Sequence, residues 1–362
     1  MAVERRTYMK DEEKIIPLDI ENFYNPYPSM SRFSTIDILL QTGGRGIGKT
    51  YSWKFIAVCN FIKKGEHFFY FRRTDAELDS IEEIFSDMYL NFPFYQFKVQ
   101  KNRFYIKRPC HKDWEKFGFY RSICALKNFK GSNYPMVSLM LLDEFQIDTE
   151  DRVSDRYRPG EYKKLIKAYE TIARERPVKL ILISNAESMH NPYFAGLGVN
   201  YSKLKDGYNI GKKNEAVYCI EIIPPNEKII ERKKNTRSFR LSTTIDEDKV
   251  SLENRFRDDD ESRTKRPPEK GYPVCNIKIN GCVYGCEQYE GDMYFSKRFF
   301  SGAPTYVIEK KDISDDTEFV TSYTANFRLR CIRSLFRKGQ VWYNSKKTRF
   351  AVESFFEKTN IL

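Results

Sequence analysis

Hydrophobic residues in this chain gather in short uninterrupted runs, and the stretches between these runs carry hydrophobic residues at helical spacing. A short apolar run bounded by glycine or polar residues is typical of a strand buried on both faces. Such strands alternating with helices indicate a parallel sheet covered by helices on both faces. The predicted strands are residues 36–42, 67–71, 137–142 and 178–183, and the predicted helices are residues 50–63, 78–90 and 162–174.

The sequence also predicts a helix N-cap, a half-exposed strand and the boundaries of the domains. Ser80 is the expected N-cap of the helix predicted over residues 78–90, because glutamates follow it. Residues 96–107 alternate between apolar and polar, which predicts one half-exposed strand. After Pro224 and Pro225 the chain becomes densely charged, and short apolar runs return later. We therefore predict an ATPase-type domain over residues 1–225, a charged linker over 226–271 and a smaller α+β domain over 272–362.

Composition narrows the class of protein. The chain has 362 residues, 41% of them hydrophobic, and a formal net charge of +12. A basic balance of this size is typical of proteins that work on phosphate backbones. The eight cysteines are scattered and match no common zinc spacing, which favours reduced thiols and a cytosolic compartment. The charged N-terminus predicts no signal peptide, and no apolar run reaches the ~20 residues that cross a bilayer.

A glycine-rich segment at the end of the first predicted strand carries the strongest chemical signal. It fits the pattern G-x-x-x-x-G-K-[ST], whose glycines let backbone N–H groups approach phosphate oxygens. The following helix adds the positive end of its dipole. The lysine is expected to meet the β- and γ-phosphates of ATP, and the threonine hydroxyl to hold Mg²⁺. The segment consists of Gly43, Gly44, Arg45, Gly46, Ile47, Gly48, Lys49 and Thr50.

Polar residues at the ends of two later strands complete the predicted ATP site. The third predicted strand ends in Asp143 and Glu144, so Asp143 is expected to hold Mg²⁺ and Glu144 to act as general base on the attacking water. Asn185 follows the fourth strand, and it is expected to sense the γ-phosphate because neighbouring strand ends open onto one crevice. The alternative for Asn185 is a simple strand-ending turn.

An arginine from a neighbouring subunit is the remaining part of a ring-forming ATPase, because it neutralises charge in the transition state. Arg174 and Arg176 precede the fourth predicted strand and are the first choice for this role. Arg72 and Arg73, which follow the second strand, are further candidates. The alternative for Arg174 and Arg176 is a solvated helix end, where a cation suits the helix dipole.

These motifs, in this order, resemble the DNA-packaging ATPases of phi29-like phages, a specialised branch related to the terminase large subunits. The resemblance covers roughly residues 20–200. It rests on the glycine-rich segment, on Phe-Tyr-Asn-Pro from Phe23 to Pro26, on Leu-Asp-Glu-Phe from Leu142, on Ser-Asn-Ala from Ser184, and on Asn-Pro-Tyr-Phe from Asn191 to Phe194.

The resemblance implies a P-loop NTPase fold of the ASCE type, with a mostly parallel sheet and flanking helices. It also implies a C-terminal domain like an RNase H-type nuclease that has lost its catalytic carboxylates. The cofactors would be ATP and Mg²⁺. The partners would be double-stranded DNA, the portal or connector vertex, a structural packaging RNA, and further copies of the chain in a ring, with a pentamer expected. Such a protein would work in the host cytoplasm, docked on the viral prohead and on no membrane.

Other interpretations stay open on the residues alone. One is a helicase or another nucleic-acid remodelling ATPase, and a second is a nucleotide-gated assembly protein that does not turn ATP over. A third is a terminase-like protein with an active nuclease domain, for which Asp292, Glu309 and Asp312 are candidate carboxylates whose spacing does not compel convergence. Basic residues at 232–240 and 328–338 suit sequence-independent contact with nucleic acid.

Overall fold

The computed structural model describes residues 15–125, 133–147, 157–158, 160–189, 191–199, 203–237, 263–266, 270–279 and 281–361. The chain divides into two compact units. The N-terminal unit comprises Met1–Ser188, Gly196–Gly198 and Leu204–Arg257, and the C-terminal unit comprises Met189–Ala195, Val199–Lys203 and Asp258–Leu362. The predicted three-part division, with a linker over residues 226–271, stays a prediction.

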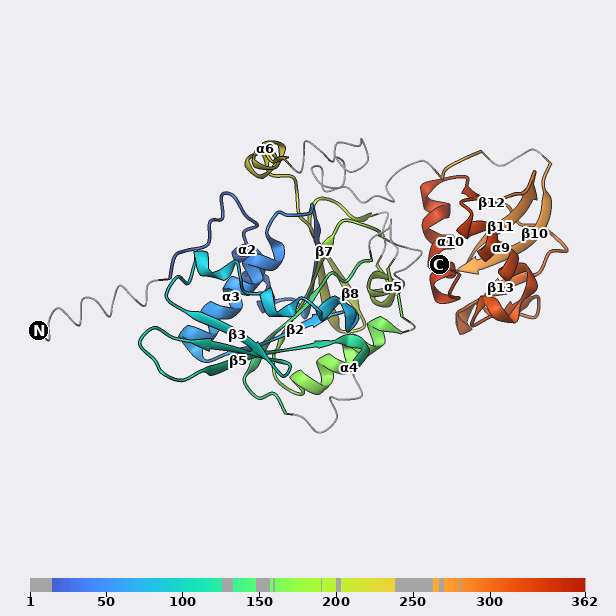
Figure 1. Ribbon diagram of the computed structural model, residues 1–362. Helices are drawn as coiled ribbons and strands as arrows, with labels where there is room; N and C mark the ends of the chain where they lie inside the picture. The colour runs from blue at the N-terminus through green and yellow to red at the C-terminus, as the bar shows by residue number, and fades with distance from the viewer. Residues whose placement is uncertain are drawn as a thin grey trace, which may run out of the picture. The chain divides into compact units, whose positions relative to one another are not determined.

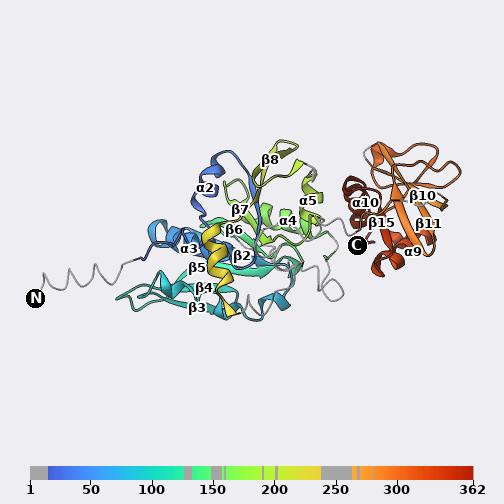
Figure 2. The ribbon, with the colours of Figure 1, turned by 90° about the horizontal axis from the view of Figure 1, so that it is seen from above.

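A nine-stranded sheet forms the centre of the N-terminal unit (Figure 1). Its strand order is β3-β4-β5-β2-β6-β7-β1-β9-β8, and the six strands from β5 to β9 in this order run parallel. Antiparallel pairs close both edges, with β3 and β4 at one edge and β8 at the other (Figure 2). The strands are β1 (Ile38–Gly43), β2 (His67–Arg72), β3 (Gln96–Gln100), β4 (Arg103–Lys107), β5 (Glu115–Ser122), β6 (Val137–Asp143), β7 (Lys179–Asn185), β8 (Gly207–Lys213) and β9 (Ala216–Ile222).

The apolar runs in the sequence become the interior strands of this sheet, as predicted. Every residue of β1 is buried, and β6 and β7 are buried over nearly their whole length. Helix α3 contacts β2 and β6, and α4 contacts β6. On α4, Leu165, Ala168 and Ile172 are buried at helical spacing and form its core-facing side. The helices between residues 15 and 237 are α2 (Tyr27–Ser31), α3 (Lys49–Lys64), α4 (Glu161–Ala173), α5 (Pro192–Leu197) and α6 (Glu227–Lys234), and the division between the two units falls within α5.

The helix predicted over residues 78–90 is wrong. The segment forms short 3₁₀ turns, and the Ser80 side chain accepts no capping bond. Lys54 of α3 reaches into the segment, where its ammonium group bonds the Ile84 carbonyl oxygen and lies 2.7 Å from the Asp87 carboxylate. The N–H of Met88 bonds the Phe85 carbonyl oxygen, three residues earlier, as in a 3₁₀ turn. The 3₁₀ helices of the N-terminal unit are Arg32–Ser34, Ala76–Leu78, Ile81–Glu83 and Met88–Leu90.

The single strand predicted over residues 96–107 is a hairpin of β3 and β4. Lys101 and Asn102 form its turn with φ of 49° and 62°. Two positive values in succession are the signature of a type I′ turn, which suits the twist of the paired strands. The pattern was interpreted correctly as strand, but the four consecutive polar residues 100–103, which form a turn without glycine, were not recognised as a break. Strands β5, β8 and β9 were not predicted.

The C-terminal unit holds a second sheet of six strands, in the order β14-β13-β10-β11-β12-β15. An antiparallel meander of β10, β11 and β12 is continued by β13 and β14, which run parallel to β10. This is the strand arrangement expected of an RNase H-like domain, and β14 and β15 were not predicted. The elements are β10 (Tyr272–Ile279), β11 (Cys282–Tyr289), β12 (Asp292–Ser296), β13 (Thr305–Val307), β14 (Thr317–Phe319), β15 (Val341–Tyr343), α9 (Phe327–Arg337), α10 (Lys346–Lys358) and the 3₁₀ helices Lys310–Asp312 and Tyr323–Ala325.

None of the eight cysteines, all of which lie within the described residues, forms a disulfide bond. Within the described residues, no helix combines the length and apolar composition that a bilayer crossing requires.

Candidate functional site

The glycine-rich loop joins the buried strand β1 to helix α3 and positions Lys49 at the first turn of that helix. Gly46 and Gly48 have φ of 73° and 90°, which only glycine adopts without strain. A Cβ on Gly48 would lie 2.8 Å from the Phe23 ring, so close packing also requires glycine there. The loop is therefore fixed by backbone conformation and by the Phe-Tyr-Asn-Pro segment beside it.

Lys49 is buried and turned toward its own loop. Its ammonium group donates to the carbonyl oxygens of Gly43 and Gly44, at 3.1 and 2.8 Å. Burial lowers the pKa of Lys49 to about 7, and the Asp143 carboxylate counteracts part of that shift. A phosphate oxygen placed here would favour the charged form of the lysine. A bound anion would therefore stabilise the charged form of Lys49 in this buried position.

The end of β6 brings Asp143 to the same point. Thr50 Oγ1 lies 3.1 and 3.2 Å from the two carboxylate oxygens of Asp143. Parallel strands bring their carboxyl ends to one edge of a sheet, which is why residues far apart in sequence meet. The hydroxyl and the carboxylate are hard oxygen ligands of the kind that Mg²⁺ prefers. The predicted partners Thr50 and Asp143 are therefore adjacent in the structure.

Glu144 directly follows that strand and has a left-handed backbone, with φ of 54°. Its side chain is 56% exposed and points toward β2, where Arg72 Nη1 lies 3.0 Å from Glu144 Oε2 and 3.6 Å from Asp143 Oδ2. A non-glycine residue in this conformation is uncommon and often marks a functional position. The glutamate is thus held at the mouth of the site by an arginine.

Asn185 ends β7, which pairs with β1 so that Asn185 stands opposite Gly43. Its Oδ1 lies 3.5 Å from the Lys49 ammonium group. The amide therefore lies beside the lysine of the glycine-rich loop, and its contact with the γ-phosphate stays a prediction.

Sequence reasoning missed Tyr70. It considered Arg72 only as a further candidate for the arginine that acts on a neighbouring subunit, whereas Arg72 contacts Asp143 and Glu144 of its own chain. Tyr70 donates to Asp143 Oδ2 at 2.8 Å. Burial, and then the neighbouring carboxylate, raise the pKa of Tyr70 far enough to keep its hydroxyl a neutral donor. Both residues belong to β2, which lies directly beside β6. Polar residues near the end of β2 could have been predicted to lie at the site, because the ends of neighbouring parallel strands open onto the same crevice.

Arg174 and Arg176 differ sharply in their surroundings. The Arg176 guanidinium donates to the carbonyl oxygens of Tyr134, Pro135 and Val137 at 2.7–2.8 Å, and also to that of Ile172. Arg174 is exposed and has an unusual backbone at the end of α4, with φ of 52° and ψ of −115°. Both arginines lie just before the first residue of β7. The glycine-rich loop follows the last residue of the parallel strand β1, so the arginines and the loop are at opposite ends of these strands.

The profile of the podovirus DNA encapsidation protein (Gp16) family matches residues 18–361. The chain belongs to this family. A DNA packaging protein of Bacillus phage phi29 is 29% identical over 350 residues, which cover 95% of this chain and 100% of that protein.

Solved structures of packaging motors are similar to this encapsidation protein. A chain of the bacteriophage Phi-29 viral genome packaging motor assembly is 25% identical, with a TM-score of 0.61 over 93% of this chain and 99% of that one. A chain of the Phi-28 gp11 DNA packaging motor is 20% identical, with a TM-score of 0.62 over 93% and 98%. The predicted family and α/β fold class are therefore confirmed.

The three candidate nuclease carboxylates each have a separate partner. Asp292 accepts a bond from Trp342 Nε1 at 2.8 Å, and Asp312 accepts one from the Gly281 N–H at 2.9 Å. Glu309 forms ion pairs with Lys311 and Lys358, at 2.8 and 2.7 Å. Across the described part of the chain, no group of three or more His, Cys, Asp or Glu side chains could hold a metal ion.

Of the two basic segments, the first lies partly outside the described residues, because residues 238–240 are not described. Arg232, at its start, turns toward the glycine-rich loop and donates to the Gly46 carbonyl oxygen at 3.3 Å. The second segment is α9, where Arg333 stacks on the Tyr323 ring at 4.2 Å.

Proposed function

We propose that this encapsidation protein hydrolyses ATP to drive double-stranded DNA into a viral prohead. The observation that carries the proposal is the convergence of Lys49, Thr50 and Asp143 at the carboxyl edge of one sheet. Similarity to a DNA packaging protein over 95% of the chain supports the view that ATP hydrolysis at this site drives DNA packaging. The basic net charge of +12 suits a grip on phosphates that ignores base sequence.

The residues of the glycine-rich loop bind the triphosphate. Backbone N–H groups and the Lys49 ammonium group meet the phosphate oxygens, and Asn185 reaches the γ-phosphate from the neighbouring strand. Thr50 and Asp143 are the residues that would hold Mg²⁺, which neutralises phosphate charge when bound. Tyr70 fixes the Asp143 carboxylate for that task.

Glu144 is the general base. Its carboxylate takes a proton from water as the water oxygen forms a bond to the γ-phosphorus. The bond between that phosphorus and the bridging oxygen breaks, and the electron pair leaves with ADP. The exposed position of Glu144 beside Asp143 supports this role, since an attacking water must reach it.

Arg174 is the arginine that acts on the neighbouring subunit's nucleotide. An arginine acting in trans must be exposed and must point away from its own site, which fits Arg174. Arg176 is engaged with four backbone carbonyl groups and serves as a structural support for the turn between α4 and β7.

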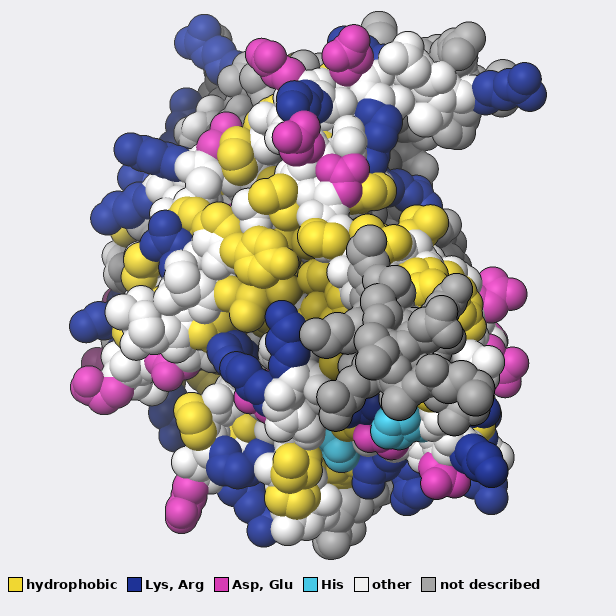
Figure 3. All heavy atoms as spheres, turned by 90° about the vertical axis from the view of Figure 1, so that its left-hand side faces the viewer, with side chains coloured by type: hydrophobic (Ala, Val, Ile, Leu, Met, Phe, Trp, Pro, Cys, Tyr) yellow, Lys and Arg dark blue, Asp and Glu magenta, His cyan; other side chains and the backbone are white. Residues whose placement is uncertain are grey.

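The working assembly is a homomeric ring, proposed as a pentamer, that docks on the portal vertex with a structural packaging RNA in the host cytoplasm. Figure 3 shows hydrophobic side chains gathered over one face and flanked by Lys and Arg, as expected of a surface that contacts other macromolecules. The C-terminal unit is proposed to bind nucleic acid without cutting it, because Asp292, Glu309 and Asp312 are each engaged elsewhere.

The proposal is tested by packaging in a purified system. The protein is mixed with proheads, linear double-stranded DNA and ATP, and DNA inside the capsid is measured as the fraction protected from added nuclease. We expect protection only when protein, proheads and ATP are all present. If the protein turned over ATP with proheads and DNA while all DNA remained accessible, the packaging role would be wrong.

A further inference from the structure

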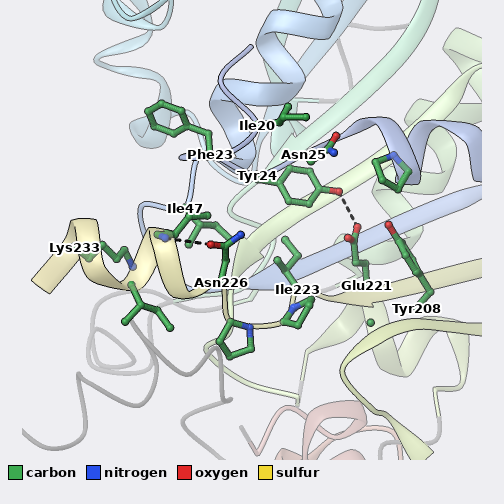
Figure 4. Close-up of a pocket in the computed structure, with 16 residues that line it drawn as sticks. Ile20, Phe23, Tyr24, Asn25, Ile47, Tyr208, Glu221, Ile223, Asn226 and Lys233 are labelled. Carbon is green, nitrogen blue, oxygen red and sulfur yellow. Dashed lines mark hydrogen bonds between the residues drawn. The ribbon is translucent and has the colours of Figure 1, made fainter.

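A cavity of about 380 Å³ lies beside the glycine-rich loop, on the side of β1 opposite β6 and β7 (Figure 4). A cavity of this size accommodates a nucleoside. Its walls are mainly apolar, and they come from the loop, the end of β9 and helix α6. Residues that line it include Ile20, Phe23, Ile47, Glu221, Ile223 and Ile229.

The cavity and the phosphate loop share walls. The N–H of Tyr24 bonds the Ile47 carbonyl oxygen at 2.8 Å. Ile223 lies 3.0 Å from the position of a Cβ on Gly43, and Lys233 lies 3.6 Å from that of a Cβ on Gly46. A ligand whose phosphates bind the loop can therefore extend its other end into this cavity.

Glu221 brings a carboxylate to this apolar cavity although it is only 5% exposed. Its Oε2 accepts bonds from the hydroxyl groups of Tyr24 and Ser29, at 2.9 and 2.7 Å, and a third from the Gln41 amide. Among the described residues, no donor reaches Oε1. Three donors thus fix one oxygen and leave the other available to a ligand.

The orientation of this network follows from a single tryptophan. The Trp53 indole N–H, which can only donate, bonds Gln41 Oε1 at 2.6 Å. The Gln41 amide nitrogen must therefore face Glu221. Burial, and then the Glu221 charge, raise the pKa of Tyr24, so its hydroxyl also stays a donor. The network consequently requires an acceptor at the Oε2 position. An amide at position 221 therefore could not flip to place its NH₂ group there.

We propose that this cavity holds the base of the bound nucleotide and that Glu221 Oε1 accepts a hydrogen bond from the 6-amino group of adenine. The inference rests on the proposed ATPase function and assigns base selectivity to a residue outside the phosphate-binding motifs. A buried carboxylate acceptor favours a base that carries an amino group, because a base without one leaves the carboxylate oxygen unpaired.

The substitution Glu221→Gln gives a directional test. Three donors hold the Oε2 position, so the amide oxygen must stay there and the NH₂ group must occupy the Oε1 position. An acceptor thereby becomes a donor that faces the donor of adenine. The substitution reverses hydrogen-bond polarity with almost no change in volume.

The experiment measures affinities of the full chain by competition against a ribose-labelled fluorescent ATP. The competitors are ATP, purine riboside 5′-triphosphate, which lacks only the 6-amino group, and inorganic tripolyphosphate. We expect wild-type protein to prefer ATP over purine riboside triphosphate about tenfold, as one charge-assisted hydrogen bond gives. Glu221→Gln should abolish that preference and leave tripolyphosphate affinity unchanged. The matched control is Glu227→Gln, at an exposed glutamate on α6, which should keep the preference.

A second variant covers the case in which Glu221→Gln does not fold. Ile20→Trp fills the cavity from an exposed position and leaves the Glu221 network intact. It should lower the affinity for both nucleotides about tenfold or more and leave the affinity for tripolyphosphate unchanged. Equal wild-type affinity for the two nucleotides, or an unchanged preference in folded Glu221→Gln, overturns the inference. Unchanged ATP affinity in Ile20→Trp overturns it as well. Wild-type protein that bound none of the three competitors would contradict the proposed function instead.

Discussion

At the scale of single residues, the site combines partners that the motifs name with others that only the fold supplies. Lys49, Thr50 and Asp143 were predicted from their patterns, and the structure places them within bonding distance of one another or of the loop. Tyr70 belongs to no motif, yet its hydroxyl bonds the carboxylate that the motif provides. Tyr70 thus lies in the candidate site although no sequence motif marks it.

Tyr70→Phe removes one hydroxyl from the site and leaves the ring. The Asp143 carboxylate loses a buried donor, so we expect the Mg²⁺ concentration for half-maximal ATP turnover to rise about tenfold, as is usual for groups that orient metal ligands. A Mg²⁺ titration of ATPase activity measures this. Tyr169→Phe is the matched control, because its hydroxyl bonds the Val178 carbonyl at the amino end of β7. An unchanged Mg²⁺ requirement in Tyr70→Phe would rule out the orienting role.

At the scale of elements, the four central strands β1, β2, β6 and β7 were predicted because burial on both faces leaves a simple apolar run, whereas β5 and β9 were missed. The sequence-based prediction also failed where tertiary contacts replaced local preference. Residues 78–90 have helical spacing, but Lys54 takes up a carbonyl oxygen inside the segment. In residues 96–107 the four consecutive polar residues 100–103 interrupt the alternation at the turn, but Lys101 and Asn102 make that turn without the glycine that usually marks it.

The candidate site was predictable to the extent that its residues are local in sequence. The glycine-rich loop and the acidic pair can be found by pattern. The acceptor position of Glu221 cannot, because it depends on Gln41 and Trp53, which come from other elements. The different surroundings of Arg174 and Arg176 also emerge only from the folded chain.

Substitutions at two glycines with left-handed backbones distinguish the effect of backbone strain from the effect of a steric clash at the glycine-rich loop. Gly48→Ala and Gly65→Ala both place a Cβ at positive φ, at a cost of about 1 kcal/mol in the free energy of unfolding. Only the Cβ at Gly48 also meets a ring, that of Phe23 at 2.8 Å, whereas Gly65 has nothing within 4 Å. We expect Gly48→Ala to lose ATP binding and Gly65→Ala to retain it. Thermal unfolding and nucleotide titration measure both, and equal ATP affinities would show that the Phe23 contact is unimportant.

At the scale of the whole molecule, the account requires subunits that complete one another's sites. Arg174→Ala should leave thermal stability and ATP binding unchanged and reduce turnover in the assembled motor at least tenfold. Arg176→Ala should instead lower the free energy of unfolding by about 2 kcal/mol, because the partly buried carbonyl groups of Tyr134 and Val137 lose their donor. Thermal melts and ATPase rates separate the two.

Mixed assemblies test whether Arg174 acts between subunits. Arg174→Ala and Lys49→Ala proteins are each expected to be inactive alone. Mixed in one ring, they create interfaces that pair an intact loop with an intact arginine, so part of the activity should return. No recovery in rings shown to contain both variants would place the arginine's action within its own subunit.

The central claim is that the loop around Lys49 and the acidic pair at the end of β6 act on one nucleotide. Glu144→Gln tests it most directly, with ATP affinity and ATP turnover measured on the same preparation in the presence of DNA and proheads. The account predicts nearly unchanged affinity and turnover reduced by a factor of about 10²–10⁴, as expected for loss of a general base. Turnover at the wild-type rate would contradict it.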